Sequence, residues 1–76
     1  MINKYGVEMI DVDSSNVRSV GYDESSATLY IQFSNNTMYV YKGVPIVEFE
    51  GLINAPSIGS YLHRNIKSMY PYERIE

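Results

Sequence analysis

Residues 29–45 constrain the fold of this chain more than any other stretch. Apolar residues alternate there with polar or aromatic ones on both sides of the pair Asn35-Asn36, and this period of two is typical of β-strands. Asparagine tolerates a positive φ, so the pair suits the tight turn of a β-hairpin. A two-residue turn at the pair, or a four-residue loop over residues 34–37, would set Phe33 opposite Met38. The sequence therefore predicts a hairpin in that register.

The two faces of the hairpin would then differ in chemistry. One face is aliphatic, with Ile31 opposite Val40, and is predicted to be core. The other face is predicted to carry four side chains, namely Tyr30, Gln32, Tyr39 and Tyr41. Bases stack on aromatic rings with little sequence preference, so this face is a candidate stacking platform. The alternative is that a helix of the same chain or a second subunit covers it, because tyrosine is common at interfaces.

Other strands are predicted over residues 17–22 and 27–33, and the second strand of the hairpin over residues 37–42. Residues 1–15 hold either a short edge strand or an arm that packs on a neighbour. Short polar turns join the strands, and such connections make an antiparallel meander. The hairpin ends at a proline, where the apolar spacing changes from two to three or four.

Pro45 has its φ preset for the first turn of a helix, and the pair Ala55-Pro56 would end that helix. Ser57 is a good N-cap for a second helix. Its predicted apolar stripe consists of Ile58, Leu62, Ile66 and Met69. Residues 72–76 are predicted to be a tail. The predicted fold class is α+β, with a small antiparallel β-meander of three or more strands followed by two short α-helices, in a single domain over residues 1–76 whose core spans about 12–70.

Composition narrows the function classes. The chain has 76 residues, a net charge of −3, eight tyrosines and no cysteine. Disulfides and thiolate metal sites are excluded, and no apolar run is long enough for a signal peptide or membrane helix, so we expect the cytoplasm of a bacterium or of a phage-infected cell. The acidic balance argues against broad electrostatic capture of nucleic acid. A domain this small buries only about 60% of its unfolded surface, so we expect a homo-oligomer.

A local exception to the acidic balance is the stretch of residues 51–72, which holds no Asp or Glu. The start of the second helix offers free amides and serine hydroxyls near Gly59, which could bind an anion; a plain N-cap with a close helix contact is the alternative. Arg64 could clamp a phosphate with its planar fork, and Lys67 could add charge. A solvated helix face is the alternative for these cations and the neighbouring His63.

Catalysis and metal binding have little support. A Ser-His-Asp set could be assembled on paper around His63, but the chain has one histidine and many serines, and it lacks a nucleophile elbow. We therefore expect no enzyme activity, no metal site and no cofactor. Five of the nine acidic side chains are predicted to lie in turns or on solvated faces, namely Asp11, Asp13, Asp23, Glu48 and Glu50.

Several short motifs occur in a familiar order over residues 12–67. They are Ser14-Ser15, Gly21-Tyr22-Asp23, Leu29-Ile31-Phe33, Tyr39-Val40-Tyr41, Val44-Pro45, Ala55, Ser57, Gly59, Tyr61 and Ile66. In this order the chain resembles the KTSC family, a small domain found at the C-terminus of some lysyl-tRNA synthetases and as stand-alone bacterial and phage proteins. The central tyrosines resemble the family's YxY motif. The resemblance implies a small antiparallel sheet with following helices, and it carries a suggestion of RNA binding.

Two departures from the family pattern are visible. The hairpin turn is Asn35-Asn36, where the family usually has a glycine. The segment after Tyr61 reads Leu-His-Arg, where the family tends to show an aromatic residue and then asparagine. Arg64 is thus a local gain for binding an anion.

The first functional hypothesis is a non-enzymatic module that binds a nucleotide-type ligand. In its sharpest form it is a phage-type oligomeric sponge that sequesters a cyclic nucleotide immune signal. The alternatives are an RNA-binding accessory domain, with short RNA as partner, and a protein-interaction module. The candidate ligand-binding residues are Tyr30, Gln32, Tyr39, Tyr41, Ser57, Gly59, Ser60, Tyr61, His63, Arg64 and Lys67.

Overall fold

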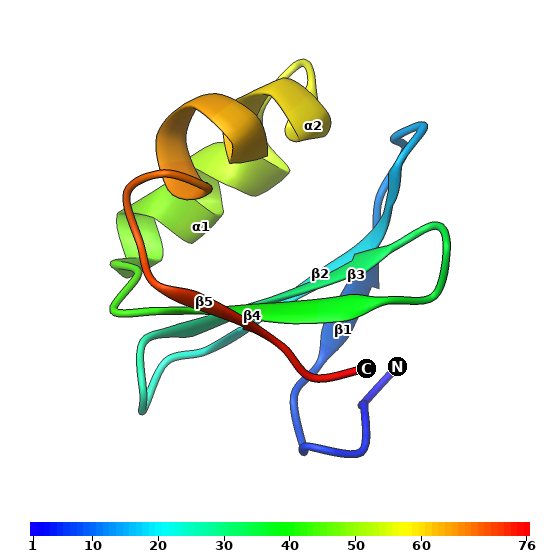
Figure 1. Ribbon diagram of the computed structural model, residues 1–76, viewed down its shortest axis with the longest axis vertical. Helices are drawn as coiled ribbons and strands as arrows, with labels where there is room; N and C mark the ends of the chain where they lie inside the picture. The colour runs from blue at the N-terminus through cyan, green and yellow to red at the C-terminus, as the bar shows by residue number, and fades with distance from the viewer.

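Five antiparallel strands form one sheet in the computed structural model, which describes residues 1–76, and the helices lie over one face of it (Figure 1). The strands stand in chain order: β1 (Met9–Asp11), β2 (Val17–Asp23), β3 (Thr28–Phe33), β4 (Met38–Lys42) and β5 (Tyr72–Arg74). Between β4 and β5 come α1 (Ile46–Ile53), α2 (Ile58–Tyr61) and a π-helical turn η1 (Leu62–Ile66). The predicted α+β class is confirmed. The predicted tail is wrong, because its first three residues form β5 and pair with β4.

The β3–β4 hairpin is shifted by one residue from the predicted register. Met38 lies opposite Gln32 rather than opposite Phe33. The N–H of Phe33 donates to the carbonyl of Thr37 at 2.9 Å, and Asn36 has a φ of 69°. A three-residue loop with its last residue in the left-handed region is a common hairpin connection. The asparagines thus marked the turn correctly but not its length.

This one-residue shift separates the predicted stacking platform into two faces. Tyr39 and Tyr41 now share the face of Leu29, beneath the helices, whereas Tyr30 and Gln32 lie on the opposite face. The prediction that these four polar and aromatic side chains form one surface is therefore wrong. The ring of Tyr41 is only 1% exposed and belongs to the core.

The main core lies between the sheet and the helices. Its ten buried members are Val17, Val20, Leu29, Ile31, Tyr41, Val44, Leu52, Ile58, Leu62 and Ile66. Helix α1 begins after Pro45, as predicted, and Phe49 on it stacks on Tyr22 with ring centroids 5.3 Å apart. The hydroxyl of Tyr22 donates to the carbonyl of Val44, which fixes the chain where it leaves the sheet.

The second helical segment departs from the predicted regular stripe. Ser57 caps it as expected, by accepting from the N–H of Ser60 at 3.3 Å. In η1, however, the N–H of Lys67 donates to the carbonyl of Leu62 at 2.8 Å, which is the wider spacing of a π-turn. The extra residue rotates the following segment, so Tyr70 packs on the core and Met69 is 68% exposed. Placing Met69 on the buried stripe was therefore wrong.

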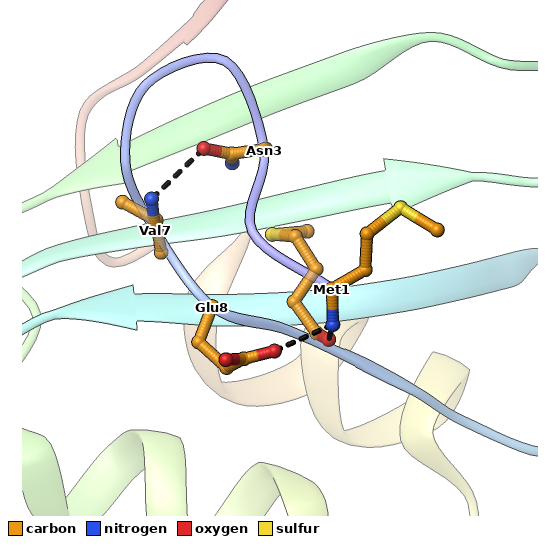
Figure 2. A network of polar contacts seen from close by, with 5 residues as sticks. Met1, Asn3, Val7 and Glu8 are labelled. Atoms are coloured by element: carbon orange, nitrogen blue, oxygen red, sulfur yellow. Dashed lines mark hydrogen bonds and ion pairs between the residues drawn. The ribbon is translucent and has the colours of Figure 1, made fainter.

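A loop at the N-terminus covers part of the opposite face (Figure 2). The side-chain oxygen of Asn3 accepts from the N–H of Val7 at 3.0 Å, and the amino group of Met1 pairs with the carboxylate of Glu8. Val7 and Met9 make a small apolar cluster with Met38, against which Tyr30 and Ile75 pack. Of the two alternatives for the first residues, the edge strand is confirmed as β1.

Gly21 allows the N-terminal segment to approach the sheet closely. A Cβ atom there would lie 2.6 Å from the sulfur of Met9 and 2.8 Å from the carbonyl oxygen of Glu8. We expect Gly21→Ala to lower the free energy of unfolding by about 1–3 kcal/mol, measured by chemical denaturation. The double variant Gly21→Ala/Met9→Ala should lose less than the sum of the two single losses, because the Met9 side chain is one of the groups that the added Cβ would clash with. Two fully additive losses would show that the clash lies elsewhere.

Candidate functional site

A groove of about 330 Å³ lies between the end of the helical segment and strands β4 and β5. It opens on the face of the sheet that the helices cover. The lining residues come from the hairpin, from β5 and from the residue that follows η1; they are Phe33, Asn35, Thr37, Tyr39, Tyr41, Lys67 and Tyr72. Three of them, Tyr39, Tyr41 and Lys67, are residues that the sequence predicted, and the structure brings these three together.

The aromatic rings of the groove form a continuous series. Phe33 meets Tyr39 edge to face at 5.6 Å, and Tyr72 lies 5.9 Å from Tyr39 and 5.8 Å from Tyr41. Strand pairing explains the series, because β5 sets Tyr72 directly opposite Tyr41. Tyr72 is 60% exposed and Tyr39 half-buried, so these two present ring surface while Tyr41 is part of the core below. Such rings can stack on a planar ligand.

The polar groups of the groove favour an anion. Lys67 is its only charged lining residue, and none of the salt bridges in the protein involves it. Burial, followed by the nearby hydroxyls of Tyr39 and Tyr72, raises the pKa of Tyr41 to about 12. Its hydroxyl therefore stays neutral near pH 7 and can donate a hydrogen bond.

A second groove, of about 350 Å³, gathers another part of the predicted site at the start of α2. Its lining residues are Ala55, Pro56, Ser57, Ser60, Tyr61, Arg64 and Asn65. Arg64 thus lines a different groove from Lys67. A regular helix would place these two cations on one face, and the π-turn between them changes that relation.

Two side chains of this second groove, those of Ser57 and Tyr61, form hydrogen bonds within the chain. Ser57 accepts from the N–H of Ser60, and the hydroxyl of Tyr61 donates to Glu48 at 2.6 Å. Tyr70 donates to the other oxygen of the same carboxylate at 3.3 Å. Glu48 therefore ties α1 to the second helical segment, and its predicted place on a solvated face is wrong. The hydrogen bond from Tyr61 to Glu48 raises the pKa of Tyr61, and burial raises the pKa of Tyr70.

The remaining predicted residues lie apart from both grooves. A Cβ atom on Gly59 would lie 3.0 Å from the side-chain oxygen of Asn16, so its close approach is to the chain itself. His63 is exposed and lines neither groove. On the opposite face, Tyr30 lies 5.8 Å from Tyr5, and Gln32 accepts from Ser19 at 3.4 Å.

Sequence reasoning missed four lining residues of the first groove, namely Phe33, Asn35, Thr37 and Tyr72. Phe33 continues the alternating apolar pattern of the hairpin, and Asn35 and Thr37 lie in its predicted turn, so none of the three carries a sequence signal for binding. Tyr72 would have been found only by recognising β5, which is three residues long. No cluster of three or more His, Cys, Asp or Glu side chains is placed to hold a metal ion. None of the helices has the length and apolarity needed to cross a membrane.

Tyr61 and Tyr72 make a matched pair for separating scaffold from groove. Tyr61→Phe removes the shorter hydrogen bond to the Glu48 carboxylate, and we expect it to lower the free energy of unfolding by about 1–3 kcal/mol. The tyrosine hydroxyls that form hydrogen bonds within the chain are those of Tyr22, Tyr61 and Tyr70. Tyr72→Phe should therefore change the free energy of unfolding by less than about 0.5 kcal/mol. Thermal denaturation measures both. Equal losses would contradict the assignment of Tyr61 to the scaffold.

The fold and the aromatic groove define a small α+β domain with a candidate binding surface, and comparison with known proteins agrees with its fold. The KTSC domain family matches residues 13–70. The crystal structure of a KTSC domain protein from Yersinia pestis superimposes with a TM-score of 0.88, at 31% identity over 92% of this chain and 99% of that one. The chain belongs to the KTSC domain family.

Curated relatives include both long and short proteins. A lysine–tRNA ligase of Nostoc sp. is 33% identical over 67 residues, which are 88% of this chain but 12% of the ligase. A protein of Stutzerimonas stutzeri is 32% identical over 71 residues, which are 92% of this chain and 100% of that protein. The domain therefore occurs both alone and as a small part of a much longer enzyme.

Proposed function

We propose that the protein is a non-enzymatic module that binds a nucleotide-type ligand in the groove between Lys67 and strands β4 and β5. The observation that carries the proposal is the combination of partly exposed aromatic rings with one free ammonium group in a groove without acidic residues. The base stacks against Tyr39 and Tyr72, and Lys67 pairs with a phosphate. The second groove, with Arg64, is not needed for this pose.

Calorimetric titration with mononucleotides tests this proposal. We expect Tyr39→Ala to weaken binding roughly 5- to 150-fold, because stacking on an aromatic ring contributes about 1–3 kcal/mol per base. Lys67→Ala should also weaken binding and reduce its dependence on salt. Arg64→Ala is the matched control, since it removes an exposed cation that lines only the second groove. Loss of affinity in Arg64→Ala with none in Tyr39→Ala would contradict the proposed pose.

A second candidate function is accessory binding of single-stranded RNA. It is favoured by the lysine–tRNA ligases, which carry a similar stretch and act on tRNA. Salt dependence separates the two functions. The affinity for a mononucleotide held by one lysine should fall only slightly as the salt concentration rises. The affinity for an RNA that pairs with several lysines and arginines should fall steeply. Affinity only for RNA, with a steep slope, would favour the second function.

The sharper form of the proposal is sequestration of a cyclic nucleotide immune signal by a homo-oligomer in the cytoplasm of an infected cell. It requires three further properties: an oligomeric mass, tighter binding of a cyclic than of a linear nucleotide, and recovery of the ligand unchanged. Light scattering, competition with cyclic mono- and dinucleotides, and chromatography of the released ligand test them in turn. A monomer that binds linear and cyclic ligands equally would leave the simpler binding function only.

A further inference from the structure

The turn that closes the β3–β4 hairpin places one amide side chain in the groove with its oxygen already occupied. The oxygen of Asn35 accepts from the hydroxyl of Thr37 at 2.7 Å and from the N–H of Thr37 at 3.2 Å. An amide oxygen has two lone pairs, so its capacity to accept is filled. The amide nitrogen, with two donors, keeps its capacity free. Both residues line the groove described above.

The orientation of this amide follows from chemistry. The backbone N–H of Thr37 can only donate, so the atom of Asn35 facing it must be the oxygen. The nitrogen therefore points away from Thr37. Asn35 is exposed, so its nitrogen is accessible to a ligand. A ligand in the groove thus meets a donor at this residue and no free acceptor.

We infer that Asn35 makes the groove selective for keto bases, guanine and uracil, over the amino bases adenine and cytosine. This inference rests on the proposed function, because it names the base of the same ligand. Guanine presents two acceptors, N7 and O6, on one edge, whereas adenine presents the acceptor N7 beside an amino donor at N6. Uracil presents the acceptor O4 where cytosine presents an amino donor. An unrestrained asparagine reads adenine by using both its oxygen and its nitrogen. Here the oxygen is committed to Thr37, and two donors facing one another repel.

Thr37 is the positioning residue in this arrangement. It holds the amide oxygen through its hydroxyl and its backbone, so Thr37→Val removes one of two bonds while conserving the shape of the side chain. The freed lone pair restores an acceptor to Asn35. We expect adenosine monophosphate to bind better in this variant than in the original protein, and guanosine monophosphate to bind no better.

The test is calorimetry with the 5′-monophosphates of guanosine, inosine, uridine, adenosine and cytidine. We expect roughly tenfold tighter binding of the guanosine than of the adenosine compound, and of the uridine than of the cytidine compound. Inosine monophosphate is the matched control, because it keeps O6 and N7 but lacks the 2-amino group, and it should bind like guanosine monophosphate. Asn35→Ala should bring the affinities for keto and amino bases together.

The outcomes separate this inference from the proposed function. Equal affinity for all five ligands, with Tyr39→Ala weakening each, would overturn the inference and leave the proposed function standing. Tighter binding of the amino bases would overturn it as well. Absence of binding by every ligand would overturn both. Keto selectivity that is lost in Asn35→Ala and relaxed in Thr37→Val supports the inference.

Discussion

Replacing Tyr41 with alanine is expected to lower the free energy of unfolding by about 3–5 kcal/mol, as large aromatic-to-alanine truncations in protein cores do. The side chain is 1% exposed and packs in the main core, on the face of β4 beneath the helices. Its removal takes away a large apolar surface and leaves a cavity under Tyr72, whose ring centroid is 5.8 Å away. Chemical denaturation followed by circular dichroism measures the loss.

The same substitution tests the register of the hairpin. In the register that the sequence predicted, Tyr41 would lie on a polar face with Tyr30 and its truncation would cost little. A loss below about 1 kcal/mol would therefore contradict the structure and restore the predicted pairing. Tyr41→Phe is the matched control: it keeps the ring in the core, so its loss should remain below about 1.5 kcal/mol.

Alkaline pH is expected to destabilise the protein strongly, and Tyr41 is the principal cause. Burial raises the pKa of Tyr41 from 10.0 to about 12. The unfolded chain therefore ionises first as pH rises, while the folded protein keeps its proton. The stabilisation from this group is fully present below pH 10, falls between pH 10 and 12, and amounts to about 2–3 kcal/mol over that window.

Denaturation midpoints measured between pH 8 and pH 12 test this expectation. Tyr41→Phe should show a shallower fall than the original protein, because one of the responsible hydroxyls is gone. Some dependence on pH should remain, since burial also raises the pKa of Tyr22 and of Tyr30. Parallel curves for the two proteins would show that Tyr41 ionises freely in the folded state.

The sequence was sufficient for the placement of most elements but not for the register of the hairpin. Val17 and Phe33 lie at strand ends close to those predicted, and α1 starts after Pro45 as expected. The register depended on a three-residue loop over residues 34–36, whereas the asparagine pair suggested a loop of two or four residues. The alternation of apolar and polar residues could not reveal the correct register, because both faces of β4 are covered. Val40 and Tyr41, which point to opposite faces, are both buried. A strand that is covered on both faces has no clearly polar face, so its sequence does not show which side chains point toward the main core.

The candidate site was only partly predictable for a related reason. The tyrosines of β4 and Lys67 were identified by chemistry, but their grouping depends on two features with weak sequence signals. One is β5, three residues long, which adds Tyr72. The other is the π-turn, whose extra residue separates Arg64 from Lys67. The spacing of apolar residues along a helix does not reveal one additional residue inside a turn.

The most direct test of the central claim is a nuclear magnetic resonance titration of the ¹⁵N-labelled protein with guanosine monophosphate. We expect the amide shifts to concentrate at Tyr39, Lys67 and Tyr72 and to saturate, while the amides of Ser57 and Arg64 do not shift. Shifts centred on Ser57 and Arg64 would place the ligand in the other groove and contradict the claim. An unchanged spectrum at millimolar nucleotide would contradict nucleotide binding altogether.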